Sequence, residues 1–385
     1  MVFGKCTPSI RGLVLFRAAK RTTILGIGQI FFVYSKKKFY LCGEFGDMNN
    51  RFAFYIIMVS LFWAGCSSKN EVVYTWDPVT NVEALWEIID TKYCYVEQKG
   101  LDWAAVRDKY TAKAASLKKN DEVALFDLCA EMLNLLRDGH VNLYSPFDRS
   151  FNTAWYDTLP LNFNSRLQAL YLKNYRIAGG LYYSTIDQDS IGYIYYSSFS
   201  DSFTGTNLYY VFSAFKDCRG IVLDVRNNGG GSLDNAYKLA SPFFSENRLI
   251  GYWHHKSGPG HNDFSELEPL YTDTALVRSK WFRPLVVLCN RRSYSATNSF
   301  VSMMRYADNC AVVGGKTGGG GGMPLSYEMP CGWMVRFSSV RMYDRDKNDI
   351  EQGVMPHLMV NQTSDDKDDL IEAAIALINK AYEKE

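Results

Sequence analysis

Three features that would define other classes of protein are missing from this 385-residue sequence. None of its nine cysteines has C-x-x-C spacing, so neither a zinc site of that type nor a dithiol redox motif is indicated. Its net charge is +1, with 42 basic and 41 acidic residues, so no electrostatic footprint for nucleic acid is visible. Histidine is scarce, with five in the whole chain. We therefore expect neither a metal nor a nucleic acid partner.

The near-neutral charge conceals an unusual N-terminus. Residues 1–47 carry a net charge of +6, which leaves −5 for residues 48–385. This segment has no clean amphipathic period and no Pro/Gly-marked boundary. We interpret residues 1–47 as an upstream extension produced by a misplaced start, with translation beginning at Met48.

A lipoprotein signal is predicted for residues 48–66. Arg51 precedes a mostly apolar run at 52–65, which is shorter than the ~20 residues a membrane-spanning helix needs, and the run ends at Ala64-Gly65-Cys66. This order resembles the bacterial signal in which the cysteine is lipidated. We expect Cys66 to anchor the chain in a membrane of the bacterial cell envelope, on the periplasmic side or the cell surface, with 67–76 as a tether. A buried apolar helix is the alternative.

The remaining sequence predicts an α/β protein. Residues 77–146 have the apolar spacing of about three helices, with Asn120 or Asp121 as a cap of the last. Residues 147–190 resemble a linker with short strands. From 191 to 385, apolar strands alternate with helices, which indicates a mixed or parallel sheet covered on both faces. A final amphipathic helix is expected after a Ser364/Asp365 cap.

Ser295 is the first candidate for chemistry. It follows the apolar run 284–289, PLVVLC, and precedes a predicted helix at 296–306. This position places a hydroxyl at the carboxyl edge of the sheet, where ligands bind, and beside the free N–H groups of a helix N-terminus. Serine is also a common helix cap, and by itself Ser295 would more often be a cap.

Two glycine-rich loops could lie beside such a serine. In DVRNNGGGSL, Asp224 ends a strand, and three glycines at 229–231 allow a tight turn and close approach of the backbone. The second loop, CAVVGGKTGGGGG, imitates the end of a nucleotide-binding loop at Lys316. The imitation fails, because the required first glycine is Cys310 and a glycine run replaces the following helix.

A serine nucleophile needs a base, and histidine is the usual one. His140 in RDGHV stands where a helix ends and a strand begins, which predicts an exposed imidazole. A carboxylate would orient that ring, and Glu351 in DIEQGVMP is one candidate among 41 acidic residues.

Four blocks together resemble the C-terminal-processing (tail-specific) and tricorn-core serine peptidases. In chain order they are LLRDGHVNL, GIVLDVRNNGGGSLDNAYKLASPFF, PLVVLCNRRSYSATNSF and DIEQGVMPHLMV. The resemblance implies a crotonase-like (ClpP/crotonase) α/β catalytic domain with an N-terminal helical subdomain. It also implies an exported serine endopeptidase that acts on peptide or protein substrates and needs no cofactor.

The resemblance further implies roles for individual residues. Ser295 becomes the nucleophile, and the oxyanion hole falls on the N–H groups of Ala296 and of one loop glycine, with Gly231 as the first choice and Gly230 as its neighbour. One branch of the family uses a lysine base, but its position here is Gly320. The tricorn-like branch uses a histidine and a glutamate, which match His140 and Glu351.

Other interpretations stay open at this point. Lys316 lies four residues from the lysine position and is an alternative base. A catalytically inactive peptide- or glycan-binding lipoprotein could have the same fold, since a fold does not guarantee activity. A nucleotide-binding enzyme that uses Lys316 is a third alternative.

Overall fold

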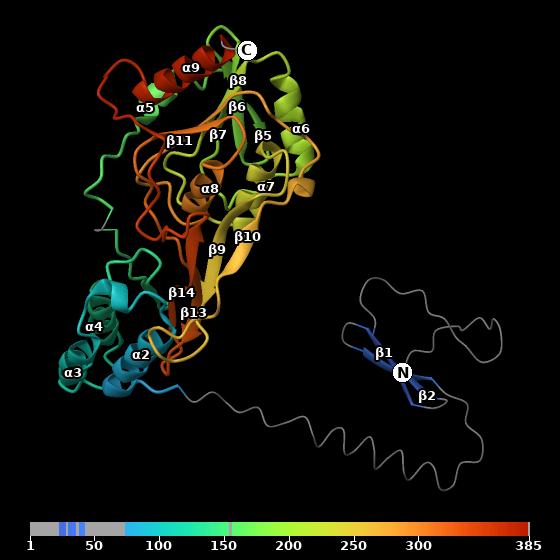
Figure 1. Cartoon of the computed structure of the whole chain (residues 1–385). Helices are drawn as coiled ribbons and strands as arrows, with labels where there is room; N and C mark the ends of the chain where they lie inside the picture. Colours follow the sequence, from blue (N-terminus) through green and yellow to red (C-terminus); the bar gives the residue numbers. More distant parts are fainter. Residues whose placement is uncertain (1–22, 28–29, 36–37, 43–73, 154–155, 384–385) are drawn as a thin grey trace. The chain divides into compact units, whose positions relative to one another are not determined.

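The computed structural model describes residues 23–27, 30–35, 38–42, 74–153 and 156–383 (Figure 1). It divides into two compact units, Met1–Val72 and Val73–Glu385. In the first unit, the described residues form a three-stranded antiparallel sheet. Its strands are β1 (Thr23–Ile27), β2 (Ile30–Ser35) and β3 (Lys38–Cys42). The predicted signal segment and Cys66 lie outside the described residues, so those predictions stay untested.

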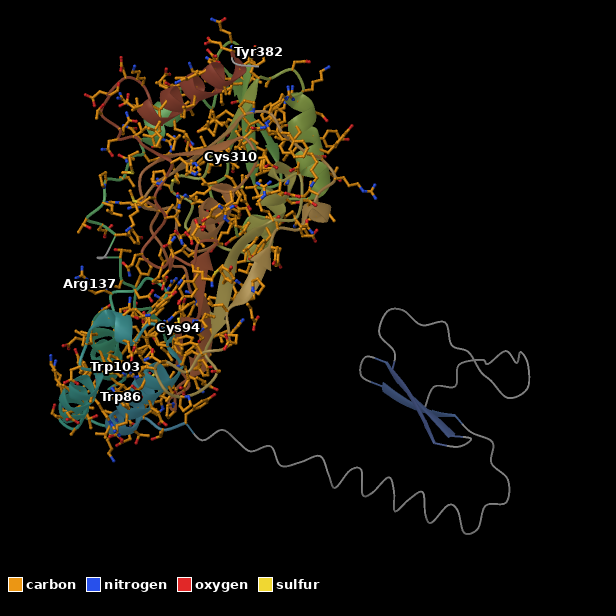
Figure 2. All side chains as sticks on the ribbon, in the orientation of Figure 1. Trp86, Cys94, Trp103, Arg137, Cys310 and Tyr382 are labelled. Atoms are coloured by element: carbon orange, nitrogen blue, oxygen red, sulfur yellow. The ribbon has the colours of Figure 1, made fainter. Side chains whose placement is uncertain are left out.

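The second unit begins with the predicted helical subdomain. Its helices are α2 (Pro78–Lys92), η1 (Glu97–Lys99), α3 (Trp103–Ala114) and α4 (Glu122–Asn134), and β4 (Asn142–Tyr144) follows. An aspartate caps each α-helix, since the side chains of Asp77, Asp102 and Asp121 accept backbone N–H groups of the first turn. Trp86 and Trp103 tie α2 to α3, because each indole N–H donates to the other's carbonyl oxygen (Figure 2).

A seven-stranded mixed sheet forms the centre of the α/β domain that follows the helical subdomain. Its spatial order is β15 (Leu358–Met359), β12 (Cys310–Gly314), β11 (Leu285–Cys289), β8 (Gly220–Asp224), β7 (Ile191–Tyr195), β6 (Leu181–Ile186) and β5 (Arg176–Ala178). The five strands from β15 to β7 are parallel, and β6 and β5 are antiparallel to their neighbours. The expected linker 147–190 thus contributes two strands, so the boundary expected at 191 falls inside this sheet.

Alternate residues of the central strands pack on opposite faces of the sheet. Val286 and Leu288 share a core with α9 (Asp369–Tyr382), whereas Leu285 and Val287 share a core with Phe300 on the other side. That second face is covered by α6 (Gly205–Ala214), α7 (Leu233–Ala240), η2 (Ser241–Phe243) and α8 (Ala296–Met304), while α5 (Ser165–Gln168) is a short turn of helix. Burial of both faces explains why the strands are continuously apolar.

A second sheet connects the α/β domain with the helical subdomain. It contains β10 (Glu268–Tyr271), β9 (Leu249–His255), β14 (Met334–Asp344) and β13 (Met323–Glu328), and β4 also pairs with β14; η3 (Thr274–Leu276) follows β10. The long strand β14 begins in the core of the helical subdomain, where Val335 and Phe337 are buried. Strand β14 therefore brings residues from late in the chain to the segment that follows α4.

The C-terminal helix begins later than expected. Its cap is Asp368, whose side chain accepts the N–H groups of Leu370 and Ile371, and not Ser364 or Asp365. Ser364 and its neighbour Thr363 instead donate backbone N–H groups to Asp369, which closes a turn before the helix. In the described part of the chain, no helix is long and apolar enough to cross a membrane.

Candidate active site

Ser295 stands in the turn between β11 and α8, as predicted. Its backbone adopts φ 58° and ψ −124°, a conformation that is rare for a residue with a side chain and is kept here by surrounding contacts. The Ser295 N–H donates to the carbonyl of Gly319 at 2.8 Å. Although Ser295 is the N-cap residue of α8, its hydroxyl makes no capping hydrogen bond. The hydroxyl is directed to a different partner.

That partner is the imidazole of His140. Nε2 of His140 lies 2.9 Å from Oγ of Ser295, and Nδ1 lies 3.3 Å from Oγ of Ser338. When Nε2 accepts from Ser295, Nδ1 carries the hydrogen and donates to Ser338. Two side chains 155 positions apart are therefore in the arrangement that a serine nucleophile and its base require.

His140 is buried, so the prediction of an exposed imidazole was wrong. The reason is tertiary: Ser338 of β14 and Gly320 pack against the ring, and only 2% of the residue is exposed. The pKa of His140 is lowered to about 4, mainly by burial; the charge of Asp138 acts in the opposite direction, and Arg336 makes a smaller lowering contribution. At neutral pH the ring is therefore neutral, which is the state a general base needs.

Asp138 fixes the segment that carries His140, and sequence reasoning did not find it. Its carboxylate accepts the backbone N–H of His140 at 2.7 Å and the hydroxyl of Tyr93 at 2.6 Å. Ser338 was also missed, although Arg336 and Ser338 alternate with the apolar Val335 and Phe337 at the start of β14 and so point to one face. That alternation was the available signal.

The loop 229–231 lies against the Ser295 turn. Gly230 has φ +98°, and a Cβ there would stand 2.8 Å from the Cβ of Ser295 and 3.0 Å from the nitrogen of Ala296. The Gly230 N–H donates to Oδ1 of Asn228 at 3.0 Å. The N–H groups of Gly231 and Ala296 meet no acceptor among the described residues. The roles predicted for these three residues in an oxyanion hole stay predictions, and Gly230 is the one whose N–H is already engaged.

Asn228 joins three parts of the structure around this loop. Its Oδ1 accepts the hydroxyl of Thr297 in α8 at 2.7 Å in addition to the Gly230 N–H, and its Nδ2 donates to the carbonyl of Tyr196 at 2.8 Å. Asn228 is fully buried, so each of these bonds replaces water. The side chain holds the glycine loop, α8 and the end of β7 in one arrangement.

Asn227 and Asn290 connect the glycine loop directly to the loop that follows β11. The Asn227 N–H donates to Oδ1 of Asn290 at 3.0 Å, and Nδ2 of Asn290 donates to Oδ1 of Asn227 at 2.9 Å. Ser293 donates its hydroxyl to the carbonyl of Val225 at 2.8 Å. The loops after β8 and β11 are thus cross-linked just before Ser295.

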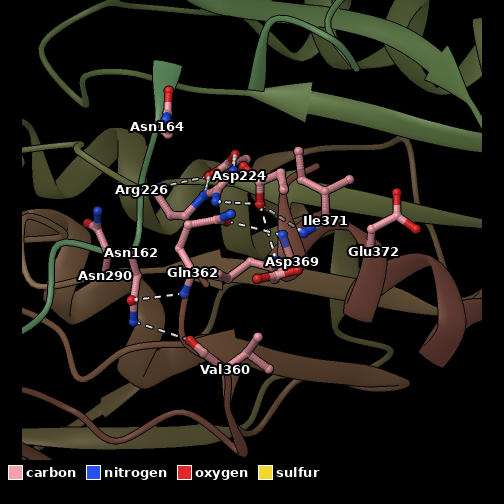
Figure 3. Close-up of polar contacts among 12 residues, drawn as sticks. Asn162, Asn164, Asp224, Arg226, Asn290, Val360, Gln362, Asp369, Ile371 and Glu372 are labelled. Carbon is pink, nitrogen blue, oxygen red and sulfur yellow. Dashed lines mark hydrogen bonds and ion pairs between the residues drawn. The ribbon is translucent and has the colours of Figure 1, made fainter. Parts of the chain in front are cut away.

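A buried ion cluster supports the start of the glycine loop (Figure 3). Arg226 is fully buried, and its guanidinium contacts Asp224 at 2.6 Å and Asp368, the cap of α9, at 2.9 Å. Tyr193 donates its hydroxyl to Asp224 at 2.7 Å. The C-terminal helix is therefore anchored two residues before Asn228.

Glu351 is buried near the site but does not contact the imidazole. Ser338 has the position on Nδ1 that sequence reasoning gave to Glu351, and Oε2 of Glu351 has no partner among the described residues. Burial, followed by the nearby charge of Asp138, raises the pKa of Glu351 well above its ordinary value. The assignment of Glu351 as a catalytic residue stays a prediction.

At Gly320, the position that corresponds to the lysine base, the surrounding side chains leave no space for a lysine. A Cβ on Gly320 would lie 2.5 Å from Cζ of Tyr294 and 3.0 Å from Cε1 of His140, and its φ is +71°. The position of the family's lysine is therefore filled by the histidine ring and its aromatic neighbour. Lys316 is half-buried and makes no hydrogen bond or ion pair within the described part of the chain, so the structure does not bring it to Ser295. Nor do these residues contain a cluster of three or more His, Cys, Asp or Glu side chains fit for a metal ion.

Two family models match this chain. Residues 190–360 match the model of peptidase family S41, and residues 80–134 match the tricorn protease C1 domain. The first match contains the glycine loop, Ser295 and Glu351, whereas His140 lies between the two matched segments.

A solved structure and a curated sequence that are similar to this chain are both described as peptidases. The crystal structure of a candidate peptidase from Parabacteroides merdae is 44% identical, with a TM-score of 0.73, over 78% of this chain and 96% of that one. A "Probable CtpA-like serine protease" of Staphylococcus haemolyticus is 29% identical over 171 residues, which are 44% of this chain but 33% of that protein. The match thus spans about a third of that curated relative.

One more distant structure supports the fold. Mature CPAF is 12% identical with a TM-score of 0.58, and the superposition covers 79% of this chain and 98% of CPAF. The predicted mixed α/β fold with its N-terminal helical region is confirmed. This chain belongs to peptidase family S41, a family of serine peptidases.

Proposed function

We propose that this chain is an exported serine endopeptidase with Ser295 as nucleophile and His140 as general base. One observation carries the proposal: the Ser295 hydroxyl leaves the helix N-terminus uncapped and lies 2.9 Å from Nε2 of a buried imidazole whose pKa is lowered to about 4. A serine that served only as a cap would direct its oxygen to the N–H groups of α8.

The reaction that this arrangement supports is acyl transfer. His140 accepts the Ser295 proton while Oγ attacks the peptide carbonyl, and N–H groups of Ala296 and the glycine loop stabilise the negative charge on the carbonyl oxygen. The imidazolium then protonates the leaving amine. Water hydrolyses the acyl-enzyme by the same steps, with His140 again acting as base, so no cofactor takes part.

Ser338 and Glu351 would assist the imidazole in different ways. Ser338 contacts Nδ1 and can accept its hydrogen in the tautomer that leaves Nε2 free to accept from Ser295. Glu351, buried in the region of Asp138, would stabilise the positive charge that develops on the ring only in its ionised form, which burial and the charge of Asp138 disfavour. Asp138 already acts in that direction on the pKa of His140.

Labelling with a fluorophosphonate probe tests the proposal. The wild-type protein should react covalently, Ser295→Ala and His140→Ala should abolish or strongly slow labelling, and Lys316→Ala should leave it unchanged. Loss of labelling in Lys316→Ala would show that lysine is the base. No labelling of the wild type would overturn the proposal in favour of an inactive peptide- or glycan-binding lipoprotein.

The location is a separate proposal that rests on the sequence at 48–66. Cys66 would be lipidated and would hold the mature chain to a membrane of the cell envelope. Expression from Met48 with radiolabelled palmitate should label the wild type and not Cys66→Ala, and only the wild type should sediment with membranes. Equal behaviour of the two proteins would contradict lipidation at Cys66.

A further inference from the structure

Two arginines converge on one neutral oxygen near the proposed base. Nη2 of Arg149 and Nη1 of Arg336 each lie 3.4 Å from Oδ1 of Asn142. Asn142 is the second residue after His140 and pairs with Arg336 in the register of β4 and β14. The two guanidinium groups therefore meet immediately beyond the segment that positions the imidazole.

Neither guanidinium has a carboxylate partner among the described residues. Two buried or half-buried arginines of the catalytic domain do: Arg226 pairs with Asp224 and Asp368, and Arg248 pairs with Asp308. Asp148, next to Arg149, accepts the backbone N–H of that residue and forms no ion pair with its side chain. Each guanidinium has five N–H donors, and the single amide oxygen they share satisfies few of them.

The pair is both close to the proposed reaction centre and open to solvent. Arg336 precedes Ser338 by two residues in β14, so their side chains share a face, and Ser338 contacts His140. Arg336 is near enough to lower the pKa of His140. Arg149 is exposed and covers the rings of Tyr144 and Phe151, at 5.0 and 5.6 Å from their centroids. Arg336 is therefore close to the proposed base, and Arg149 beside it is open to solvent.

We propose that Arg149 and Arg336 bind a carboxylate group of the peptide substrate and so determine which peptides are cleaved. The carboxylate comes from an acidic side chain or from the free C-terminus of the peptide. Two planar guanidinium groups offer the paired N–H donors that match carboxylate geometry, and Asn142 holds the pair in place before substrate arrives. This inference rests on the proposed peptidase function and names the substrate class of that site.

Matched peptides separate the two sources of the carboxylate. One cleavable sequence is made in four forms, with Glu or Gln at each acidic position and with a free or amidated C-terminus. The wild type should cleave at least one carboxylate-bearing form with a kcat/KM about tenfold above its neutral counterpart. Collapse of the Glu/Gln ratio in Arg336→Gln and Arg149→Gln identifies a side chain, and collapse of the free/amide ratio identifies the C-terminus.

Controls distinguish loss of this site from loss of the enzyme. Arg278→Gln removes an exposed arginine that has no ion pair among the described residues, and it should keep the wild-type ratios. Fluorophosphonate labelling should persist in both arginine variants, because Ser295 and His140 are intact. Arg336→Lys should recover only part of the preference, since lysine keeps the charge and loses the paired donors.

Two outcomes would overturn the inference in different ways. Wild-type ratios in labelled Arg149→Gln and Arg336→Gln would show that the arginines do not select carboxylates, while the peptidase function stands. Absence of both labelling and cleavage in the wild type would remove the proposed function and this inference with it. Should Arg336→Gln unfold, Arg149→Gln alone decides the question, because its exposed side chain is not part of a core.

Discussion

Oγ of Ser295 lies 2.9 Å from Nε2 of His140, and a single strand, β14, presses Ser338 against the opposite nitrogen of that ring at 3.3 Å. The imidazole is thus held from two sides by residues of the second half of the chain. Both its orientation and its proton affinity depend on this enclosure, because burial is the main cause of the lowered pKa.

The pH dependence of activity should reflect the lowered pKa of the buried His140. Since the pKa of His140 is lowered to about 4, the ring stays neutral as pH falls from 7 and becomes protonated only near pH 4. We expect kcat/KM for a peptide to be constant between pH 5.5 and 7 and to fall tenfold per unit below about pH 4. Stopped-flow mixing from neutral pH, with circular dichroism as a control for unfolding, measures this limb. A limb centred near 6.5 would contradict the buried state.

Gly320 should be intolerant of any side chain. With φ +71° and a prospective Cβ 3.0 Å from His140 Cε1, Gly320→Ala should displace the ring and lower the labelling rate at least tenfold. Gly320→Lys should not restore activity to His140→Ala, since Tyr294 occupies the same space. Gly205→Ala is the matched control, because nothing lies within 4 Å of a Cβ there and its φ is not positive. Restoration by Gly320→Lys would contradict the steric argument.

The candidate residues on the catalytic sheet could be predicted because their signals are local. A buried strand followed by a turn and a helix is sufficient to place Ser295 at the carboxyl edge, and the glycines at 229–231 follow a strand in the same way. The burial of His140 could not be predicted from RDGHV, because its cover comes from Gly320 and Ser338, about 200 residues later.

The partners of the ring were unpredictable for a similar reason. Glu351 was selected from motif order, but the residue that faces Nδ1 depends on the register of β4 with β14, which pairs Asn142 with Arg336 and so brings Ser338 to the ring. The predicted start of the C-terminal helix was wrong because Asp368 is the cap. Its carboxylate is also bound by Arg226, and this contact between residues 142 positions apart is not visible in the local sequence.

The Asn228 network should control the rate more than it controls binding. Thr297→Val removes the hydroxyl that donates to Asn228 Oδ1 at 2.7 Å, and so loosens the glycine loop that lies against Ser295. We expect kcat to fall about tenfold with KM within twofold, and the free energy of unfolding to fall by about 1–2 kcal/mol. Thr111→Val is the control, because its hydroxyl has no partner among the described residues and should be lost without effect. A change confined to KM would argue against a positioning role.

Arg226 should be the charged residue on which stability depends most. Removing it by Arg226→Met leaves Asp224 and Asp368 buried without their cation, which should lower the free energy of unfolding by about 3–5 kcal/mol. Lys113→Met breaks the ion pair with Glu131, whose side chains are 42% and 51% exposed, and should cost less than about 1 kcal/mol. Urea unfolding followed by tryptophan fluorescence compares the two variants. Equal losses would mean that the cluster at the base of the glycine loop contributes no more than a surface pair, and that α9 is held by its apolar face alone.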